Sequence, residues 1–393
     1  MNLIFLGLLY TEQSLRETGL YSRHGVQMAP HTFQRTLLDG IRQLDDVRLN
    51  VISIPPSGSF PINDQRLWIR KERLEHHTQI GYCNLPWIKH SLQRRTLVKT
   101  IKELLHDAED AEDTLLAAYS PFEPFLHAIG DIKREFPKIQ SCLIVTDCIP
   151  GRGDLPKNMT WHAKLRGNRI VRLTKPIDRF ALLTKNLADT LEIGEKPYVV
   201  TECICDETFP LSKTRAVRQN ICLYTGSVNE EFNIRELADA FVGMPHAELW
   251  ICGTGSGAHD LRKMSEKHDN IRYFGFVEQD ALQKYRDHCD FLINPRRPTG
   301  TYTKYSFPSK TAEYMMSGKP VIMYKLEGVP DAYDRYLNYL HGQTPQEMRE
   351  DLEAIFAADD AVLAQKALDA RTFMMTMKNS RRQAERIVFG TDL

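Results

Sequence analysis

Short apolar runs alternate along the chain with longer stretches in which apolar residues recur every three or four positions. The short runs are typical of strands buried on both faces, and the longer stretches are typical of amphipathic helices. In the first half, the pattern predicts strands at residues 2–9, 47–54, 114–118, 141–146, 170–173, 180–183 and 198–202, and helices at 30–44, 87–108 and 121–135. Such alternation favours a parallel sheet with helices on both faces.

The pattern stops at residues 206–219, which are polar and lack periodicity, and then starts again. We interpret this segment as a linker between two α/β domains. The second half predicts strands at 221–225, 248–252, 271–274, 291–294 and 321–324, and helices at 234–241, 260–268, 280–288, 310–316 and 361–387. The chain therefore has the pattern of two doubly wound units in succession.

Composition limits the class of protein. The 393 residues contain 51 Lys and Arg and 51 Asp and Glu, so the net charge of zero argues against a nucleic-acid-binding role. No apolar run approaches the ~20 residues of a membrane helix, and we interpret the N-terminus, MNLIFLGLLY, as a buried strand rather than a signal peptide. The eight cysteines are scattered, which favours buried thiols in a reducing, cytoplasmic compartment. The sequence thus predicts a cytoplasmic protein.

The most informative segment is FPSKTAEYMMSGKPVI, residues 307–322. Pro308 and Ser309 suit the start of a helix, and Gly318 suits its end. A helix start presents free N–H groups and partial positive charge, to which Lys310 adds a full charge. One turn further, the Glu313 carboxylate can accept hydrogen bonds from hydroxyl groups. An anion site beside a hydroxyl site matches the chemistry of a nucleoside diphosphate.

This segment, with Asn294-Pro295-Arg296 and Gly226-Ser227, resembles the group 1 (family 4) glycosyltransferases, and among them those of bacterial capsule and exopolysaccharide pathways. The resemblance implies the GT-B architecture, in which two Rossmann-like domains face a central cleft. The expected divisions are an acceptor-side domain at 1–205, a linker at 206–219, a nucleotide-sugar domain at 220–360 and a C-terminal helix at 361–393 that crosses back to the first domain.

The resemblance also implies roles for residues of the second domain. Two positions depart from the family pattern of basic residues that hold the diphosphate, because they carry Ser227 and Phe232, and Tyr305 stands where the family has a first glutamate. Arg296, Arg297 and Lys310 are candidates to replace the missing charges. The expected donor-binding residues are Glu313, Lys310, Ser309, Gly226, Ser227, Arg296, Tyr305, Gly253, Gly255, Phe276 and Val277.

Candidates in the first half lie in loops after predicted strands, where ligands of open α/β sheets bind. Gly25 matches a glycine-bearing loop of the family that faces the cleft, and His24 beside it is a candidate to touch acceptor or phosphate. Asp147 follows a strand and is a candidate to orient an acceptor hydroxyl. His24 and Asp147 are also weak candidates for catalysis, with simple solvation or loop capping as the alternative, so no catalytic residue is assigned.

These features predict transfer of a sugar from a nucleotide sugar to a glycan or lipid-linked glycan in polysaccharide biosynthesis. By resemblance, the transfer retains the anomeric configuration and needs no metal or cofactor. One alternative is a non-catalytic nucleotide- or glycan-binding relative. Another is an NAD(P) oxidoreductase, because the turn from Gly253 to Ala258 nearly fits a dinucleotide fingerprint. Residues 61–105 are basic and carry aromatic residues, which suggests a peripheral contact with an anionic membrane or inward packing of the aromatic rings.

Overall fold

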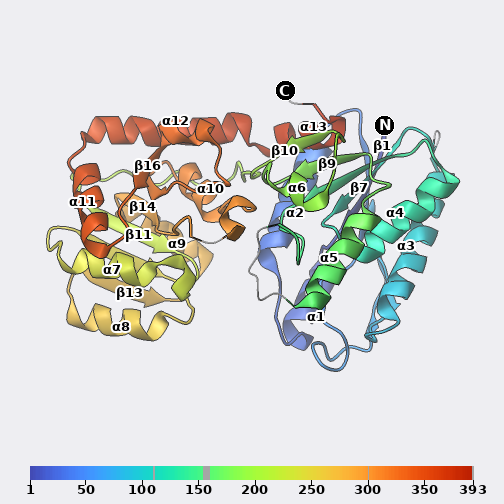
Figure 1. The fold of residues 1–393 in the computed structure, drawn as a ribbon, viewed down its shortest axis with the longest axis horizontal. Helices are drawn as coiled ribbons and strands as arrows, with labels where there is room; N and C mark the ends of the chain where they lie inside the picture. The colour runs from blue at the N-terminus through green and yellow to red at the C-terminus, as the bar shows by residue number, and fades with distance from the viewer. Residues whose placement is uncertain (109–110, 154–159, 300, 392–393) are drawn as a thin grey trace. The chain divides into compact units, whose positions relative to one another are not determined.

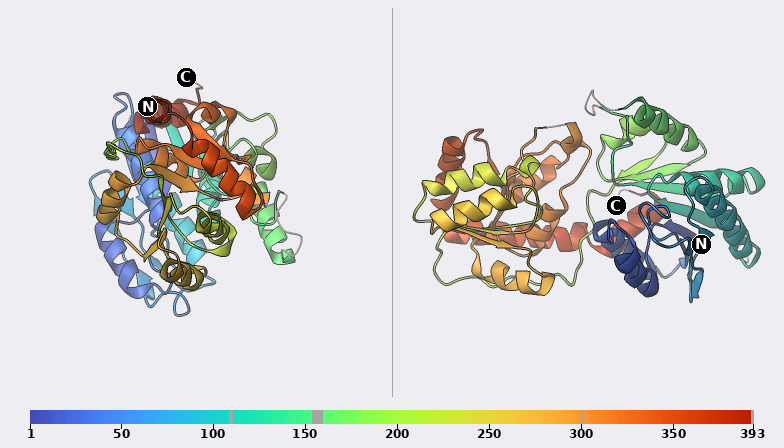
Figure 2. Two further views of the ribbon diagram at one scale, coloured as in Figure 1. Left: turned by 90° about the vertical axis from the view of Figure 1, so that its left-hand side faces the viewer. Right: turned by 90° about the horizontal axis from the view of Figure 1, so that it is seen from below.

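The structure is a computed structural model, and it describes residues 1–108, 111–153, 160–299 and 301–391. The chain divides into two compact units (Figure 1). Unit 1 contains Met1–Ile204 and Ser380–Leu393, and unit 2 contains Cys205–Asn379. Each unit has its own parallel sheet, and Figure 2 shows helices on either side of each sheet. The predicted fold class, two doubly wound α/β domains, is confirmed.

Unit 1 is built on an eight-stranded sheet that is parallel except for its last strand, β4, which runs antiparallel to β5. In spatial order, its strands are β10 (Tyr198–Val200), β9 (Arg179–Leu182), β8 (Gln140–Val145), β7 (Thr114–Tyr119), β1 (Asn2–Gly7), β2 (Arg48–Ser53), β5 (His77–Gln79) and β4 (Glu72–Leu74). Its helices are α1 (Glu12–Tyr21), α2 (Met28–Arg42), α3 (Lys89–His106), α4 (Glu123–Glu135), α5 (Trp161–Leu173), α6 (Leu187–Leu191) and α13 (Ser380–Phe389). A separate two-stranded sheet pairs β3 (Trp68–Ile69) with β6 (Tyr82–Cys83).

Two local predictions for unit 1 are wrong. Residues 170–173 were predicted as a strand but end helix α5, since their β-branched pair, Ile170 and Val171, forms a buried helical face with Gly167. A side chain at Gly167 would lie 2.2 Å from the carbonyl oxygen of Pro150, so the helix packs there by close backbone approach. Helix α1 lies between the predicted strand at 2–9 and the predicted helix at 30–44, where the pattern predicts no helix. Thr11 begins α1 with a capping box, a signal that hydrophobic periodicity alone overlooks.

The C-terminal residues form two helices rather than one. The first, α12 (Asp360–Met377), belongs to unit 2, and the second, α13, belongs to unit 1. In α13, Ala384, Ile387 and Val388 lie in the core of unit 1 together with residues of α2. The contact between the two helices is close, because a side chain at Gly40 of α2 would lie 2.1 Å from the carbonyl oxygen of Ser380. The last helix is therefore an integral part of unit 1.

Unit 2 is built on a six-stranded sheet, parallel throughout. In spatial order, its strands are β13 (Ile271–Gly275), β12 (Glu248–Cys252), β11 (Ile221–Thr225), β14 (Phe291–Asn294), β15 (Val321–Tyr324) and β16 (Leu337–Leu340). Its helices are α7 (Ile234–Val242), α8 (Ala258–Lys267), α9 (Gln279–His288), α10 (Ser309–Met316), α11 (Pro345–Phe356) and α12, and its 3₁₀ turns are η1 (Glu230–Phe232), η2 (Thr301–Lys304) and η3 (Asp331–Tyr336). Buried apolar runs form the central strands, as the sequence pattern predicts.

The segment 206–219 contains no helix or strand, but it is fastened to unit 2. The backbone N–H of Ser212 donates to the carbonyl of Ser317 at 2.9 Å. The ammonium of the buried Lys319 donates to the carbonyl oxygens of Lys213 and Cys289, both at 2.6 Å. These bonds tie the segment to the end of α9 and to the turn after α10, so most of the expected linker is part of the second unit.

Candidate functional site

The order of strands in unit 2 places a topological switch point between β11 and β14. From β11 the chain proceeds to β12 and β13 on one side of the sheet, and then returns to place β14 on the other side of β11. Loops that leave the carboxyl ends of two such strands diverge, and ligands of open α/β sheets bind between them. Here the two loops begin with Gly226-Ser227 and with Pro295-Arg296. Both predicted donor-binding loops thus meet at this switch point.

Arg296 is the most unusual side chain at the switch point. It is only 9% exposed, and its Nε and Nη2 atoms have no hydrogen-bond partner among the described residues. Its guanidinium lies 3.9 Å from the ring centroid of Tyr302 and 6.0 Å from that of Phe232. Burial lowers the pKa of Arg296, whereas Tyr302 and the exposed Glu231 act in the opposite direction. A buried cation with unsatisfied donors is costly unless a ligand completes its bonds.

The contact between Arg296 and Phe232 concerns the two positions, Ser227 and Phe232, where the resembled family has basic residues. Phe232 stands where the resembled family carries a lysine, and Arg296 places its charge beside that ring. The side chain of Asn233, next along the chain, donates to the carbonyl of Pro295 at 3.4 Å, which holds the two loops together. Arg297, the second candidate, donates instead to the carbonyl of Gln343. Of the two arginines, Arg296 is the one that lies over the Phe232 ring.

Helix α10 is anchored to the carboxyl end of β11, at the same switch point. The hydroxyl of Tyr314 accepts from the backbone N–H of Thr225 at 2.9 Å and donates to the carbonyl of Thr225 at 3.2 Å. This fully buried tyrosine fixes α10 against the carboxyl end of β11. Tyr314 was not among the residues predicted from the sequence. A buried tyrosine hydroxyl needs a hydrogen-bond partner, so a tyrosine on an otherwise apolar helix face could have indicated this contact. The side-chain amide of Asn294, at the end of β14, also donates to the Thr311 hydroxyl at 3.4 Å, so the first turn of the helix lies at the switch point.

The two charged residues of α10 form a pair. The ammonium of Lys310 lies 2.8 Å from the Glu313 carboxylate, and each side chain is about one-third exposed, at 35% and 33%. Their spacing of three residues on one helix makes this contact expected. Ser309, the first residue of the helix, is exposed. A ligand at the start of this helix would therefore meet a carboxylate, an ammonium group and backbone N–H groups within one turn.

The glycine turn after β12 has a structural explanation. A side chain at Gly253 would lie 1.6 Å from the carbonyl oxygen of Gly226, and one at Gly255 would lie 2.4 Å from the Oδ1 atom of Asn229. The backbone N–H of Gly226 also donates to the carbonyl of Cys252 at 2.9 Å. The glycines allow the loops after β11 and β12 to pack on each other. This packing explains the glycine spacing without a bound dinucleotide.

Three further predicted donor residues lie around this turn and beyond it. Phe276 follows β13 and is 75% exposed, with Val277 next to it. The backbone N–H of Gly253 donates to the carbonyl of Gly275 at 2.7 Å, which places Phe276 one residue from the turn. Tyr305 is instead 4% exposed, with the Lys304 ammonium 5.1 Å from its ring centroid. Phe276 can therefore stack on a base, while Tyr305 is largely covered by protein.

In unit 1, two of the three candidates lie together. His24 and Gly25 line one pocket, and the ring of His24 is hydrogen-bonded to the Oδ1 atom of Asn63 at 3.1 Å. Gly25 has φ +65°, a conformation that favours glycine, and no atom lies where its side chain would be. Asp147 does not line this pocket; it is exposed after β8 and accepts from the hydroxyl of Thr146 at 3.1 Å. The structure therefore separates Asp147 from the other two.

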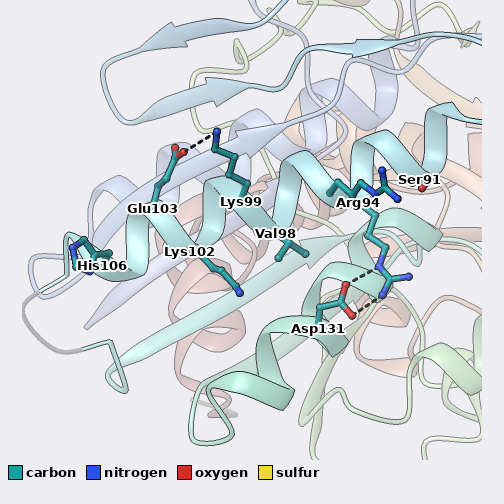
Figure 3. Close-up of a pocket in the computed structure, with 9 residues that line it drawn as sticks. Ser91, Arg94, Val98, Lys99, Lys102, Glu103, His106 and Asp131 are labelled. Atoms are coloured by element: carbon teal, nitrogen blue, oxygen red, sulfur yellow. Dashed lines mark hydrogen bonds and ion pairs between the residues drawn. The ribbon is translucent and has the colours of Figure 1, made fainter.

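The basic face of residues 61–105 is partly neutralised. Figure 3 shows the groove between α3 and α4, where Arg94 pairs with Asp131 at 2.6 Å. The ammonium of Lys99 lies 4.0 Å from the Glu103 carboxylate, and Lys102 pairs with Glu135 of α4.

Within the described ranges, no helix is long and apolar enough to cross a membrane. In the same ranges, no cluster of three or more His, Cys, Asp or Glu side chains could hold a metal ion.

Comparisons with known proteins agree with this geometry. Residues 219–358 match the family model for glycosyl transferases group 1, which spans the switch point, the glycine turn and α10. No curated protein matches the chain. The matched residues include the turn at Gly253, so this turn lies within the segment that is similar to glycosyl transferases group 1.

Similar solved structures cover the whole chain. Sucrose-phosphate synthase from Thermosynechococcus elongatus has a TM-score of 0.65 at 12% identity, covering 99% of this chain and 98% of that one. HepE from Anabaena in complex with UDP has a TM-score of 0.63 at 14% identity, covering 99% of both chains. A trehalose-6-phosphate protein from E. coli bound with UDP-2-fluoro glucose has a TM-score of 0.63 at 8% identity, covering 99% of this chain and 98% of that one. Residues 219–358 therefore match the group 1 glycosyltransferase family, and the whole chain shares the GT-B fold of these solved structures.

Proposed function

We propose that the protein transfers a sugar from a nucleoside-diphosphate sugar, bound at the β11–β14 switch point, to a glycan or lipid-linked glycan in polysaccharide biosynthesis. The observation that carries this proposal is the buried Arg296 with two unpartnered donor atoms. A guanidinium is suited to bidentate contact with phosphate oxygens. The neighbouring helix start and Lys310 add positive charge at the same switch point, so a diphosphate is the ligand whose charge best complements it.

The proposed chemistry follows from where charge develops. When the bond between the anomeric carbon and the diphosphate oxygen breaks, that oxygen gains negative charge, and Arg296 and Lys310 stabilise it more than they stabilise the ground state. Without a covalent enzyme intermediate, retention requires the acceptor hydroxyl to attack on the face from which the diphosphate leaves. The departing phosphate can then take the acceptor proton, so no side chain need act as base. In this scheme the protein's own cations neutralise the leaving group, and activity should survive treatment with EDTA.

The ribose is proposed to bind Glu313. Its carboxylate is one-third exposed and lies one helical turn beyond the phosphate-binding start of α10. A carboxylate can accept from both ribose hydroxyls. The exposed Phe276 would cover the base. UDP is the first nucleotide to test, because structurally similar proteins bind UDP or a UDP-sugar.

The test is calorimetric binding of UDP, GDP, ADP and CMP to the wild type and to Glu313→Ala. We expect one nucleotide to bind the wild type and to bind the variant about 10- to 100-fold more weakly, because a hydrogen bond to a charged group contributes ~1.5–3 kcal/mol. Glu248→Ala is a matched control, since Glu248 is 30% exposed and paired like Glu313 but lies at the start of β12. Equal affinities in all three proteins would remove Glu313 from the site. Binding without sugar transfer would favour the non-catalytic alternative.

A peripheral membrane contact is a second proposal, supported by exposed aromatic rings in unit 1. Trp87 is 94% exposed and Trp68 is 65% exposed, so these rings do not pack inward. Indole rings favour the membrane interface, and nearby lysines and arginines favour anionic lipid. Sedimentation with phosphatidylglycerol vesicles tests the idea: Trp87→Ser should reduce binding, whereas Trp161→Ser, which alters another exposed indole (64%), should not. Equal sedimentation of the three proteins, or none, would refute it.

A further inference from the structure

Unit 1 has a pocket at the switch point of its own sheet. Strand β1 lies between β2, which follows it directly, and β7, which the chain reaches later, so the crevice opens between the carboxyl ends of β1 and β7. The pocket is lined there by Leu8, after β1, and Phe122, after β7. Its volume is about 310 Å³, near the lower limit of ~300 Å³ for small-ligand sites. That volume suits one sugar residue rather than a long glycan.

One side of the pocket is positively charged. Lys89 lines it and begins helix α3, whose first turn carries no acidic residue and whose start has no side-chain cap. Among the described residues, Lys89 forms no ion pair; its ammonium lies 3.5 Å from the carbonyl oxygen of Ser57. Burial lowers the pKa of Lys89, while Asp64 acts in the opposite direction. A cation at a helix start, without a carboxylate partner, favours an anionic ligand.

The carboxylates that act electrostatically on Lys89 and on the neighbouring His90 are already paired with arginines. Asp64 is fully buried and accepts from Arg66 at Nε (3.0 Å) and Nη2 (2.7 Å). Glu123, which acts on His90 of the pocket, pairs with Arg169 at 3.2 Å. The positive charge of Lys89 is therefore not cancelled by its neighbours, and it remains available to a ligand in the pocket.

A second, independent feature points to a ligand. Gln93 lines the pocket one turn after Lys89, is 2% exposed, and has an Oε1 atom with no hydrogen-bond partner among the described residues. Its amide hydrogen-bonds the buried Tyr82 phenol, which in turn lies 3.1 Å from the Ser57 hydroxyl. A buried amide oxygen without a donor is unusual in a folded protein. A ligand hydroxyl can supply that donor.

We propose that this pocket binds the acceptor and selects a sugar that carries a phosphoryl group. Lys89 and the first turn of α3 hold the phosphoryl oxygens, and Gln93 accepts a hydrogen bond from a sugar hydroxyl. The phosphoryl group belongs either to a soluble sugar phosphate or to the phosphate of a lipid-linked sugar, since the contacts are the same. The inference rests on the proposed glycosyltransferase function, because it assigns the second substrate of that reaction.

The experiment measures binding of glucose 6-phosphate, glucose 1-phosphate, dodecyl phosphoryl glucose and glucose by calorimetry. The proteins are the wild type, Lys89→Gln, Lys89→Arg and the control Lys99→Gln, whose lysine lies on α3 but is 78% exposed. We expect a phosphorylated sugar to bind the wild type at least tenfold more tightly than glucose does, and Lys89→Gln to abolish that preference. Lys89→Arg should restore it, and Lys99→Gln should leave it unchanged. Tighter binding of the dodecyl compound than of both sugar phosphates would assign the phosphate to a lipid-linked sugar.

UDP affinity, measured on the same proteins, separates this inference from the proposed function. Wild-type protein that binds UDP but prefers no phosphorylated sugar over glucose would overturn the acceptor inference alone. An equal loss in Lys89→Gln and Lys99→Gln would overturn it as well, because the charge would then act from anywhere on α3. Protein that binds the sugar phosphates through Lys89 but binds no nucleotide would overturn the donor site and leave the pocket in place.

Discussion

Replacing Arg296 with methionine should separate ligand binding from folding. Methionine keeps an unbranched apolar stem against Tyr302 but removes the charge and the two unpartnered donors. A charge-assisted hydrogen bond contributes ~1.5–3 kcal/mol, so losing two of them to a phosphate should cost about 3–6 kcal/mol. At ~1.4 kcal/mol for each factor of ten, UDP should bind roughly 100- to 20,000-fold more weakly.

The ligand-free protein should respond differently. The variant loses a cation–π contact of ~0.5–2 kcal/mol but no longer buries an unsatisfied charge, so its free energy of unfolding should change by only ~1 kcal/mol in either direction. Calorimetry gives the affinity, and urea denaturation without ligand gives the stability. Arg272→Met is the control, because Arg272 also lies over a ring, that of Trp250, but is 52% exposed and pairs with Glu248 at 3.1 Å.

Two results would refute the reasoning about Arg296. Wild-type UDP affinity in Arg296→Met would show that the guanidinium does not hold the diphosphate. A fall of more than ~3 kcal/mol in the stability of the ligand-free variant would show that Arg296 is a structural group whose partners the protein itself supplies.

Three further predictions concern the framework of the two units. Gly253→Ala should lower the free energy of unfolding by ~1–3 kcal/mol in urea, because its methyl group would lie 1.6 Å from the Gly226 carbonyl oxygen; an unchanged value would contradict the loop packing. Tyr314→Phe should cost ~1–2 kcal/mol in the same assay and also weaken UDP binding, since α10 loses its hydrogen bonds to Thr225; full UDP affinity would disprove the anchoring role. Burial lowers the pKa of His77 from its usual 6.5 to about 4, so between these pH values the unfolded chain binds more protons than the folded protein, and the free energy of unfolding should fall as pH falls. In urea titrations at several pH values, His77→Gln should show a shallower fall than the wild type. An identical slope in the two proteins would contradict this assignment.

The sequence predicted unit 2 more accurately than unit 1. The strands of unit 2 are continuous apolar runs with polar or glycine boundaries, and Ile221–Thr225, Glu248–Cys252 and Phe291–Asn294 have the predicted bounds. In unit 1, the edge strands are only two or three residues long, too short for periodicity to show. The helix at Trp161–Leu173 was misread because two β-branched residues near its end resemble a strand.

The candidate site shows a similar limit. Residue types, together with the resemblance to a known family, were sufficient to name Glu313, Lys310 and Arg296 as candidates. The structure places them on a loop and a helix at one switch point. The burial of Arg296 depends on rings contributed by Phe232 and Tyr302, which no local pattern reveals. The unit 1 pocket likewise depends on long-range contacts, because Gln93 gains its significance only from having an unpartnered buried oxygen.

Hydrogen–deuterium exchange with and without UDP tests the central claim most directly, since it locates bound nucleotide without any mutation. If the diphosphate binds at the β11–β14 switch point, saturating UDP should slow exchange of the amides at residues 226–228, 296–297 and 309–311, which begin the two loops and helix α10. Exchange in the pocket of unit 1 should remain unchanged by UDP alone. Protection confined to other segments, or none at saturation, would contradict the account.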